Sequence, residues 1–263
     1  MSQHYPAAAV HSSRPGQRFA GMRAQTLPFT VRVVHDEDEL MQAVRIRQAA
    51  YGRHLPEFAQ TLGLPEALDM RPGVAVLLAQ SKLDGAPLGT MRIQTNRFQP
   101  LALEQSLVLP SALSACSLAE ATRLGVTGQQ VGRTVKTLLF KAYYQYCLQN
   151  DIEWMVIAGR SPIDRQYDRL LFSDVYPGMG AVPLRHAGNI LHRVMSFDVG
   201  SAERRWREAA HPLYELIFRT RHADIDLGPA CTSFLSTCRQ HRDMRQDKMA
   251  ARFGDARRRI RLT

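Results

Sequence analysis

One segment of the chain limits its possible folds more than any other. Residues 117 to 142 read SLAEATRLGVTGQQVGRTVKTLLFKA. Apolar residues alternate up to Val126, which predicts a β-strand over 117–126, and the chain then breaks at Thr127-Gly128. From about residue 130 to residue 149 the apolar spacing is that of an amphipathic helix. A strand that leads through a glycine turn into a long helix indicates an α/β fold, because the helix must pack back onto the sheet.

The other predicted elements extend this arrangement along the chain. The remaining predicted strands cover 29–34, two runs that meet at the hairpin signal Asp84-Gly85, 152–159 and 189–199. A helix is expected over 36–54, where acids crowd the first turn, and another from Ser161, the expected N-cap, onward. The order β-α-β-β-β-α-β-α-β predicts an α/β domain with a mixed central sheet and helices on both faces.

The two ends of the chain differ from its middle in composition. Residues 1–28 are rich in Ala, Ser, Pro, Gln and Arg without periodicity, which predicts a disordered N-terminal arm. Residues 29–222 form the predicted domain, and 223–263 a basic, partly helical C-terminal tail. The net charge is +10, of which nine basic and three acidic residues in 239–263 contribute +6. Such a tail could contact nucleic acid, an anionic membrane surface or an acidic protein, or it could be a solvated, frayed helix.

Several common kinds of site have no motif in this sequence. The four cysteines show no CxxC spacing and the nine histidines no HExxH motif, so we expect neither a metal site nor a disulfide framework. There is no GxxxxGK[ST] or GxGxxG motif, and no GxSxG surrounds Ser161. No run approaches the roughly 20 apolar residues of a membrane span. Because residues 1–19 also lack a signal-peptide pattern, a cytoplasmic location is the expectation.

The predicted strand at 117–126 carries an acid and a base three residues apart, Glu120 and Arg123. They could be a buried ion pair with a purely structural role. Residues three apart on a regular strand point to opposite faces, so their joint use in one cleft requires a bulge in the strand. Gly128 and Gly132 follow at the start of the predicted helix, where backbone N–H groups can bind an anion such as a phosphate.

The turn after this strand resembles a known donor-binding loop. Residues 129 to 134, QQVGRT, are similar to the loop of the GNAT-type N-acyltransferase fold that usually reads Gln/Arg-x-x-Gly-x-Gly/Ala and holds the pyrophosphate of coenzyme A. Gln129 and Gly132 match that pattern, and Thr134 replaces its last glycine. The resemblance implies that Gln129, Gly132 and Arg133 hold the donor's phosphate. The bulkier Thr134 favours a donor with one phosphodiester, the phosphopantetheine of an acyl carrier protein.

A closer resemblance spans residues 31 to 200. The motif EATRLGV resembles the Glu-x-Ser-Arg-Phe-x-Val signature of the acyl-homoserine-lactone synthases and of the related N-acyl amino acid synthases. IRQAAY, which carries Arg47 and Tyr51, resembles their LRxxxF motif, and Asp69 and Arg92 match an acid before and an arginine after the first hairpin. The tryptophan that follows the first helix of the lactone synthases is missing. The N-acyl amino acid synthases of the FeeM type are therefore the favoured branch.

This resemblance implies transfer of a long-chain fatty acyl group from an acyl carrier protein thioester to the amine of an amino acid. The amine must be neutral to attack, and Glu120 would take its proton directly or through water. The GNAT fold is known for a bulge in this strand. Backbone N–H groups at such a bulge, near Leu124, Gly125 and Val126, would stabilise the oxyanion that forms on the thioester carbonyl.

The remaining residues that match the families would bind substrate. Arg92 and Arg123 would hold the carboxylate of an amino acid acceptor, for which the guanidinium fork is well suited. Arg47 would order the first helix over the donor, with Tyr51 and Asp69 as further substrate-binding positions. No permanently bound cofactor is implied, because the acyl-phosphopantetheine of the carrier protein, or acyl-CoA as the alternative, is a substrate.

Two other functions remain open at this point. An ordinary acyl-CoA-dependent acetyltransferase would share the fold and bind coenzyme A tightly. A nucleic-acid-binding protein would rest on the basic tail alone, and the near-neutral remainder of the chain makes it the least favoured. An acyl carrier protein is acidic, so Arg133, Lys136 and Lys141 on the predicted helix, together with the tail, offer a docking face.

Overall fold

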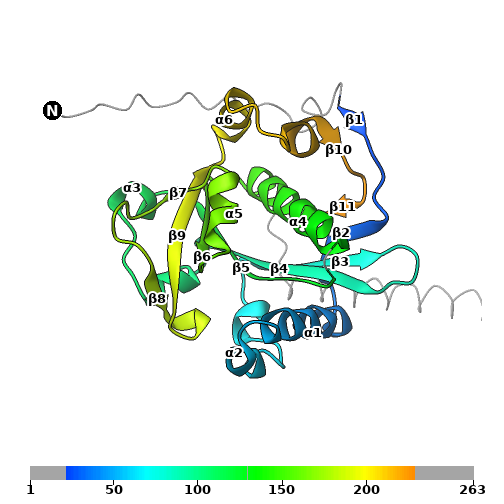
Figure 1. Ribbon diagram of the computed structural model, residues 1–263, viewed down its shortest axis with the longest axis horizontal. Helices are drawn as coiled ribbons and strands as arrows, with labels where there is room; N and C mark the ends of the chain where they lie inside the picture. The colour runs from blue at the N-terminus through cyan, green and yellow to red at the C-terminus, as the bar shows by residue number, and fades with distance from the viewer. Residues whose placement is uncertain (1–21, 129, 229–263) are drawn as a thin grey trace, which may run out of the picture.

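A mixed β-sheet forms the centre of the molecule (Figure 1). The computed structural model describes residues 22–128 and 130–228. The strands of the sheet are β2 Phe29–Val33, β3 Val74–Ser81, β4 Pro87–Thr95, β5 Leu118–Val126, β6 Trp154–Gly159, β7 Ser173–Asp174, β8 Val182–Leu184, β9 Ile190–Asp198 and β11 Ile225–Asp226. Their order is β11-β2-β3-β4-β5-β6-β9-β7, and β8 pairs with β9. The pairs β11/β2 and β5/β6 are parallel, and the other pairs are antiparallel.

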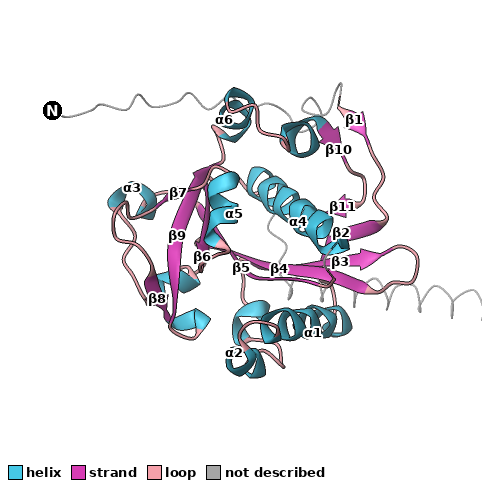
Figure 2. Cartoon of the chain, in the orientation of Figure 1, coloured by secondary structure: helices cyan, strands magenta, loops and turns pink. Residues whose placement is uncertain are grey.

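Helices cover both faces of this sheet (Figure 2). On one face lie α1 (Glu37–Gly52) and α2 (Pro56–Gln60), and on the other α4 (Gln130–Gln149) and α5 (Asp164–Arg169). The shorter helices are α3 Ser111–Ser114, α6 Ala202–Glu208, the 3₁₀-helices η2 Ala67–Met70, η3 Ala102–Gln105 and η4 Arg185–Ala187, and the π-helix η5 Glu215–Arg219. The predicted α/β class, mixed sheet and two helical layers are therefore confirmed.

The two long helices form where the sequence signals place them. The Asp36 side chain accepts a hydrogen bond from the Glu39 backbone N–H and so caps α1, whose first turn is acidic. One side of α1, including Leu40 and Ile46, packs on Val76 and Leu78 of β3. On the opposite face, α4 buries its apolar side against the larger core, which contains Val135, Leu138, Leu139, Ala142 and Tyr143. Both faces of the sheet are thus sealed around its middle strands.

Strand β5 contains the bulge that the joint use of Glu120 and Arg123 requires. Arg92 of β4 pairs with Thr122 and Thr90 pairs with Gly125, so β5 holds one more residue than β4 over this interval. Arg123 has a φ of 55°, the left-handed region that non-glycine residues rarely adopt. An extra residue bends the strand and redirects its side chains.

Strands β5 and β6 part beyond this point. Their parallel ladder ends at the pair Ala121 and Ile157, although β5 continues to Val126 and β6 continues along β9 to Gly159. The wedge between the two strands opens toward the start of α4 and α5. A break between two central strands exposes backbone and side chains that a continuous sheet would bury.

Helix α5 begins later than expected. It starts at Asp164 with Ile163 at the N-cap position and no side-chain cap, so the prediction that Ser161 caps it is wrong. A Cβ on Gly159 would lie 2.8 Å from the Tyr167 ring and 3.0 Å from the Asp164 Cα, so α5 packs directly on the end of β6. The residues in between serve as the connecting turn.

Paired structure extends beyond residues 29–222 at both ends. Strand β1 (Arg23–Ala24) pairs with β10 (Thr220–Arg221), and β11 pairs with β2. Residues 1–21 and 229–263, which hold most of the predicted arm and the basic tail, lie outside the described residues, as does Gln129. None of the helices in the described ranges is long and apolar enough to cross a membrane.

Candidate active site

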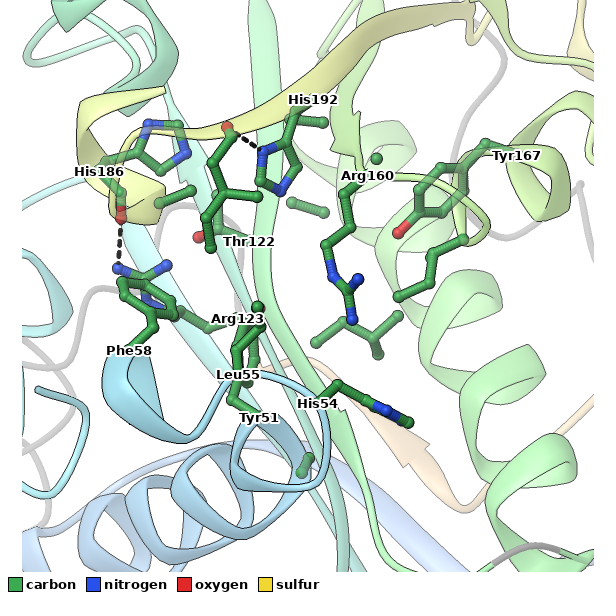
Figure 3. A pocket seen from close by; sticks show the side chains of 18 residues that line it. Tyr51, His54, Leu55, Phe58, Thr122, Arg123, Arg160, Tyr167, His186 and His192 are labelled. Atoms are coloured by element: carbon green, nitrogen blue, oxygen red, sulfur yellow. Dashed lines mark hydrogen bonds between the residues drawn. The ribbon is translucent and has the colours of Figure 1, made fainter. Parts of the chain in front are cut away.

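The wedge between β5 and β6 contains a small cavity of about 150 Å³ (Figure 3). Strand β5 contributes Thr122, Arg123 and Leu124, and β6 contributes Ala158 and Gly159. The other lining residues come from β5 (Ala121), from α1, α2 and the turn between them (Ala50, Tyr51, His54, Leu55 and Phe58), and from the segment from Arg160 to His192 (Arg160, Ile163, Tyr167, His186, Ala187, Ile190 and His192). No Asp or Glu is among these described residues. A cavity with basic and imidazole groups but no carboxylate favours a ligand that carries negative charge.

A large cavity of about 530 Å³ adjoins the small one. Leu124, Ile163 and Tyr167 line both. The rest of its lining is mainly aromatic and aliphatic, and comprises Phe140, Tyr144, Met155, Leu170, Phe172, Phe197, Trp206, Pro212, Leu213, Ile217 and Phe218, together with Thr137, Gln166, His211, Arg133, Lys136 and Arg169. Among the described residues of this lining there is again no acid. An apolar chain with an anionic group at one end fits such a lining.

Beneath the small cavity, on the α1 side of the sheet, lies a buried ion network. Arg123 donates from Nε and Nη2 to the two carboxylate oxygens of Glu66, both at 2.6 Å. Its Nη2 also donates to the backbone oxygen of His186 at 2.8 Å, and its guanidinium lies over the Phe58 ring. Arg123 thus fastens η4 and α2 to β5.

The other two predicted arginines, Arg92 and Arg47, belong to the same network. Arg92 is 1% exposed and donates from Nη1 to Glu66 at 3.0 Å and to Asp69 at 3.2 Å, and from Nε to Thr122. Arg47, also 1% exposed, donates from Nη1 to both oxygens of Asp69, at 2.7 and 2.9 Å. Neither arginine lines the small or the large cavity. The structure therefore brings these predicted residues together, with two acids as their partners.

Glu66 is the member of the network that sequence reasoning missed. Burial opposes its ionisation, but the hydrogen bond from Arg123 and the charges of Arg92, Arg123 and Arg47 lower its pKa to about 2. It is therefore a carboxylate at neutral pH, which balances part of the arginine charge.

Glu120 lies apart from both cavities. It is fully buried, and its Oε2 accepts a hydrogen bond from the backbone N–H of Leu103 at the start of η3. Its Oε1 has no hydrogen-bond partner among the described residues. Burial raises the pKa of Glu120 to about 7, against the opposing effects of the Leu103 N–H and the Arg92 and Arg123 charges. A carboxyl with this pKa can exchange a proton near neutral pH.

Similarity to solved structures extends over most of the chain. FeeM, an N-acyl amino acid synthase from uncultured soil microbes, is 18% identical over 67% of this chain and 93% of its own, with a TM-score of 0.51. BjaI, a CoA-dependent acyl-homoserine lactone synthase solved with SAM and isopentyl-CoA, is 13% identical over 81% of this chain and 99% of its own, with a TM-score of 0.52. The chain has a GNAT-like fold. No protein-family model and no curated protein sequence matches it.

In this GNAT-like fold, the residues predicted to contact the donor separate into two groups. Leu124 lines both cavities and Arg133 lines the large one. Gly125 instead allows close packing against α1, because a Cβ there would lie 3.1 Å from the Ala50 Cβ. The Val126 backbone oxygen accepts a hydrogen bond from Arg53. Gly132 lets α4 start close to the preceding turn, because its Cβ would lie 2.9 Å from the Thr127 oxygen.

Four residues of the small cavity with an imidazole or guanidinium group were not found from the sequence. His54 lies between α1 and α2, His186 lies in η4, His192 lies in β9, and Arg160 directly follows β6 (Figure 3). Burial, with Arg123 and Arg92 nearby, lowers the pKa of His186 to about 4, so its imidazole is neutral at pH 7. Arg160 forms no ion pair within the described residues, and its guanidinium donates a hydrogen bond to the Ser161 backbone oxygen at 3.5 Å. Each stands alone in its segment, so no motif in the sequence marks it.

The part of the GNAT-like fold that the structure describes contains no group of three or more His, Cys, Asp or Glu side chains placed to hold a metal ion. Tyr51, predicted as a substrate residue, lines the small cavity, where its ring packs edge-on against Phe58 at a centroid distance of 5.8 Å. Of the predicted substrate-binding arginines, only Arg123 reaches a cavity wall.

Proposed function

We propose that this chain transfers a long-chain fatty acyl group from the phosphopantetheine thioester of an acyl carrier protein to the amine of an amino acid. The proposal rests on the pair of adjoining cavities at the parted strands β5 and β6. The small one has basic and imidazole groups in its wall, and the large one is apolar with basic residues. The reaction joins an amine and a thioester to give an amide and a thiol, and it takes place in the cytoplasm.

The large cavity supports a long acyl chain. An apolar cavity of about 150 Å³ is enough for benzene, and the large cavity has about 530 Å³. An acetyl group would leave most of that space without contacts, whereas burial of each methylene contributes about 0.8 kcal/mol. Arg133, Lys136 and Arg169 would meet the phosphate of the donor and the acidic surface of its carrier protein.

The small cavity supports an acceptor with a carboxylate. Arg160 points into it between His192 and His54 and has no acidic partner among the described residues (Figure 3). Arg92 and Arg123 already donate to Glu66 and Asp69, so we assign the acceptor's carboxylate to Arg160 instead. Glu120 is the proposed acceptor of the amine's proton, which it then gives up to the leaving sulfur, because its pKa of about 7 matches the task.

A product assay tests this proposal. Purified protein is incubated with a long-chain acyl carrier protein and the twenty amino acids, and in parallel with long-chain acyl-CoA and with acetyl-CoA. Mass spectrometry identifies any N-acyl product. We expect an N-acyl amino acid from the carrier protein, reduced by about 10² to 10⁴ in Glu120→Gln, the range over which general base catalysis acts.

Each arm of the assay separates one alternative. Product from long-chain acyl-CoA alone would keep the acyl chain and acceptor but replace the donor. Product from acetyl-CoA alone would identify an acetyltransferase and contradict the role of the large cavity. Product from none of the donors would contradict acyl transfer to amino acids.

A further inference from the structure

His192 of β9 lines the small cavity, and one of its two ring nitrogens is held by the backbone. Its Nδ1 lies 2.8 Å from the backbone oxygen of Ile190. A carbonyl oxygen can only accept, so Nδ1 carries the proton of this hydrogen bond. In the neutral imidazole the other nitrogen, Nε2, then carries a lone pair and can accept a proton.

Nε2 of His192 is accessible from the small cavity. It has no hydrogen-bond partner among the described residues, and it is not one of their fully buried polar atoms that lack a partner. Nδ1 of the nearby His186 is one of those buried atoms, so the two imidazoles differ in access. In Figure 3, Nδ1 of His192 is turned to the Ile190 oxygen and the second nitrogen is turned away from it, into the space beside Arg160. A proton acceptor with a fixed tautomer therefore faces this cavity.

The groups around His192 keep its imidazole neutral at pH 7. Burial lowers the pKa of His192 and the charges of Arg160 and Arg123 lower it further, against the hydrogen bond to Ile190. His186 is neutral as well, and strand β8, which pairs with β9 here, contains no titratable residue. The other titratable side chains in the wall are His54, Tyr51 and Tyr167. No described residue of the wall offers a carboxylate that would favour an imidazolium.

An amino acid acceptor has two protons to lose from its nitrogen. The pKa of an α-amino group is about 8 or higher, so the acceptor arrives as an ammonium ion and must lose one proton before it can attack. The second proton leaves after attack, and that proton is the one assigned to Glu120 above. A carboxylate bound at Arg160 would place the nitrogen one carbon further on, beside His192 (Figure 3). The charges of Arg160 and Arg123 also disfavour an ammonium ion at this place, which eases its deprotonation.

We propose, on the basis of the acyl transfer proposed above, that His192 is a catalytic residue whose Nε2 removes the first of these protons. An N–H bond of the ammonium ion breaks, the proton binds Nε2, and the nitrogen keeps the electron pair with which it attacks the thioester carbon. His192 becomes an imidazolium and releases the proton to water, because Nε2 is not fully buried. Over the whole reaction an ammonium ion and a thioester give an amide, a thiol and one released proton.

The pH dependence of the product assay tests this role. Wild-type kcat/KM for an amino acid should change by less than about threefold between pH 7.5 and 9, because the ammonium form is used. His192→Gln can use only acceptor that is already neutral in solution, so its kcat/KM should rise about tenfold per pH unit. The loss should therefore be about 10²-fold at pH 7.5 and about threefold at pH 9. Glutamine keeps an N–H that can donate to the Ile190 oxygen.

Leu191→Gln is the matched control. Leu191 precedes His192 on β9, is 58% exposed and lines neither cavity. This variant places the same new side chain on the same strand, and it should keep kcat/KM within about threefold of wild type at every pH.

A measurement without turnover tests the tautomer. In ¹⁵N NMR of histidine-labelled protein at pH 7, the His192 signals are identified by their loss in His192→Gln. We expect a neutral ring with its proton on Nδ1. A proton on Nε2, or a charged ring, would contradict the proposal, because Nε2 could then not accept a proton.

The kinetic outcomes are distinct. A loss in His192→Gln that stays constant with pH, or no loss at all, contradicts the role of His192 and leaves the proposed function intact. An inactive wild-type protein contradicts the proposed function and, with it, this role.

Discussion

The two cavities that meet at Leu124 are built in opposite ways. The small cavity lies over a buried network of three arginines and two acids, whereas the large cavity is walled by aromatic and aliphatic side chains. Burial of paired charges contributes little net stability but fixes the geometry of the side chains. Burial of apolar surface contributes much stability but is not directional. The small cavity therefore holds its side chains in fixed positions, and the large cavity favours tight binding of an apolar group.

This contrast explains why three of the predicted signature residues, Arg47, Arg92 and Asp69, do not line either cavity. Arg47, Arg92 and Asp69 lie behind the wall, where they hold η2 and β4 against α1. In this structure they support Arg123 and the wall of the small cavity. The side chains that line the small cavity instead include Arg160, His186 and Tyr51.

Asp69→Asn should have the largest effect, because it breaks the network. Without this carboxylate, Arg47 keeps a buried charge with no acidic partner and Arg92 keeps only Glu66, which lowers the free energy of unfolding by about 3–5 kcal/mol. Denaturant unfolding measures the loss. Asp38→Asn, an exposed acid in the first turn of α1, should change it by about 0.5 kcal/mol or less. Equal, small losses in both would mean that the network does not support the fold.

Glu120→Gln should change the dependence of stability on pH. The folded protein raises the pKa of this carboxyl from 4.5 to about 7, so it binds the proton more tightly than the unfolded chain. The resulting stabilisation is fully present below about pH 4.5 and is lost as pH rises toward 7. At pH 8 the wild-type protein has lost on the order of 3 kcal/mol of unfolding free energy in this way, and Glu120→Gln does not show this loss.

Unfolding free energies at pH 5 and pH 8 check this. Relative to wild type, Glu120→Gln should gain stability between pH 5 and pH 8, while Glu57→Gln, at an exposed position of α2, should not. A difference that stays constant with pH would show that Glu120 titrates like an exposed carboxyl.

Arg160→Met tests whether the small cavity binds the carboxylate of the acceptor. Loss of a charged hydrogen bond costs about 1.5–3 kcal/mol, so kcat/KM for an amino acid should fall by about 10- to 100-fold. The corresponding amino acid amide, which has no carboxylate, should be used equally by wild type and variant. Arg165→Met, an exposed position on α5, is the control. An equal loss for acid and amide would argue against carboxylate binding at Arg160.

Leu213→Trp gives the smallest expected effect, on the donor side. The larger ring fills part of the large cavity, and excluding two methylenes costs about 1.6 kcal/mol, or about tenfold in kcat/KM for the longest acyl chains. Shorter chains should be affected less. Rates across a series of acyl chain lengths measure this, and a uniform change at every length would mean that the chain does not reach Leu213.

The fold could be predicted from the sequence because the local sequence signals agreed with the folded structure. The strand, Gly128 turn and helix at 118–149, the Asp36 cap and the Asp84-Gly85 hairpin each fix their own element. The start of α5 was mispredicted because packing of Tyr167 on Gly159, a tertiary contact, decides where the helix begins. The capping pattern that begins at Ser161 contains no signal of that contact.

The site was accessible only in part. The bulge at Arg123 was predicted because joint use of Glu120 and Arg123 in one cleft would require it and because the resembled GNAT fold has a bulge in this strand; the structure has the bulge, although Glu120 lines neither cavity. The sequence did not predict Glu66, Arg160 or His186 as members of the site. Each comes from a different segment of the chain, and the parting of β5 and β6 brings them to the site. Burial of Arg92 and Glu120 likewise depends on η2 and η3 covering the sheet, which no strand pattern encodes.

A crystal structure of the protein with a non-hydrolysable long-chain acyl-pantetheine tests the division between the two cavities most directly. The account predicts that the acyl chain lies among Phe140, Phe197 and Leu213 in the large cavity, with the carbonyl carbon at Leu124 beside the small cavity. A chain bound outside the large cavity, or a carbonyl remote from Leu124, would contradict it.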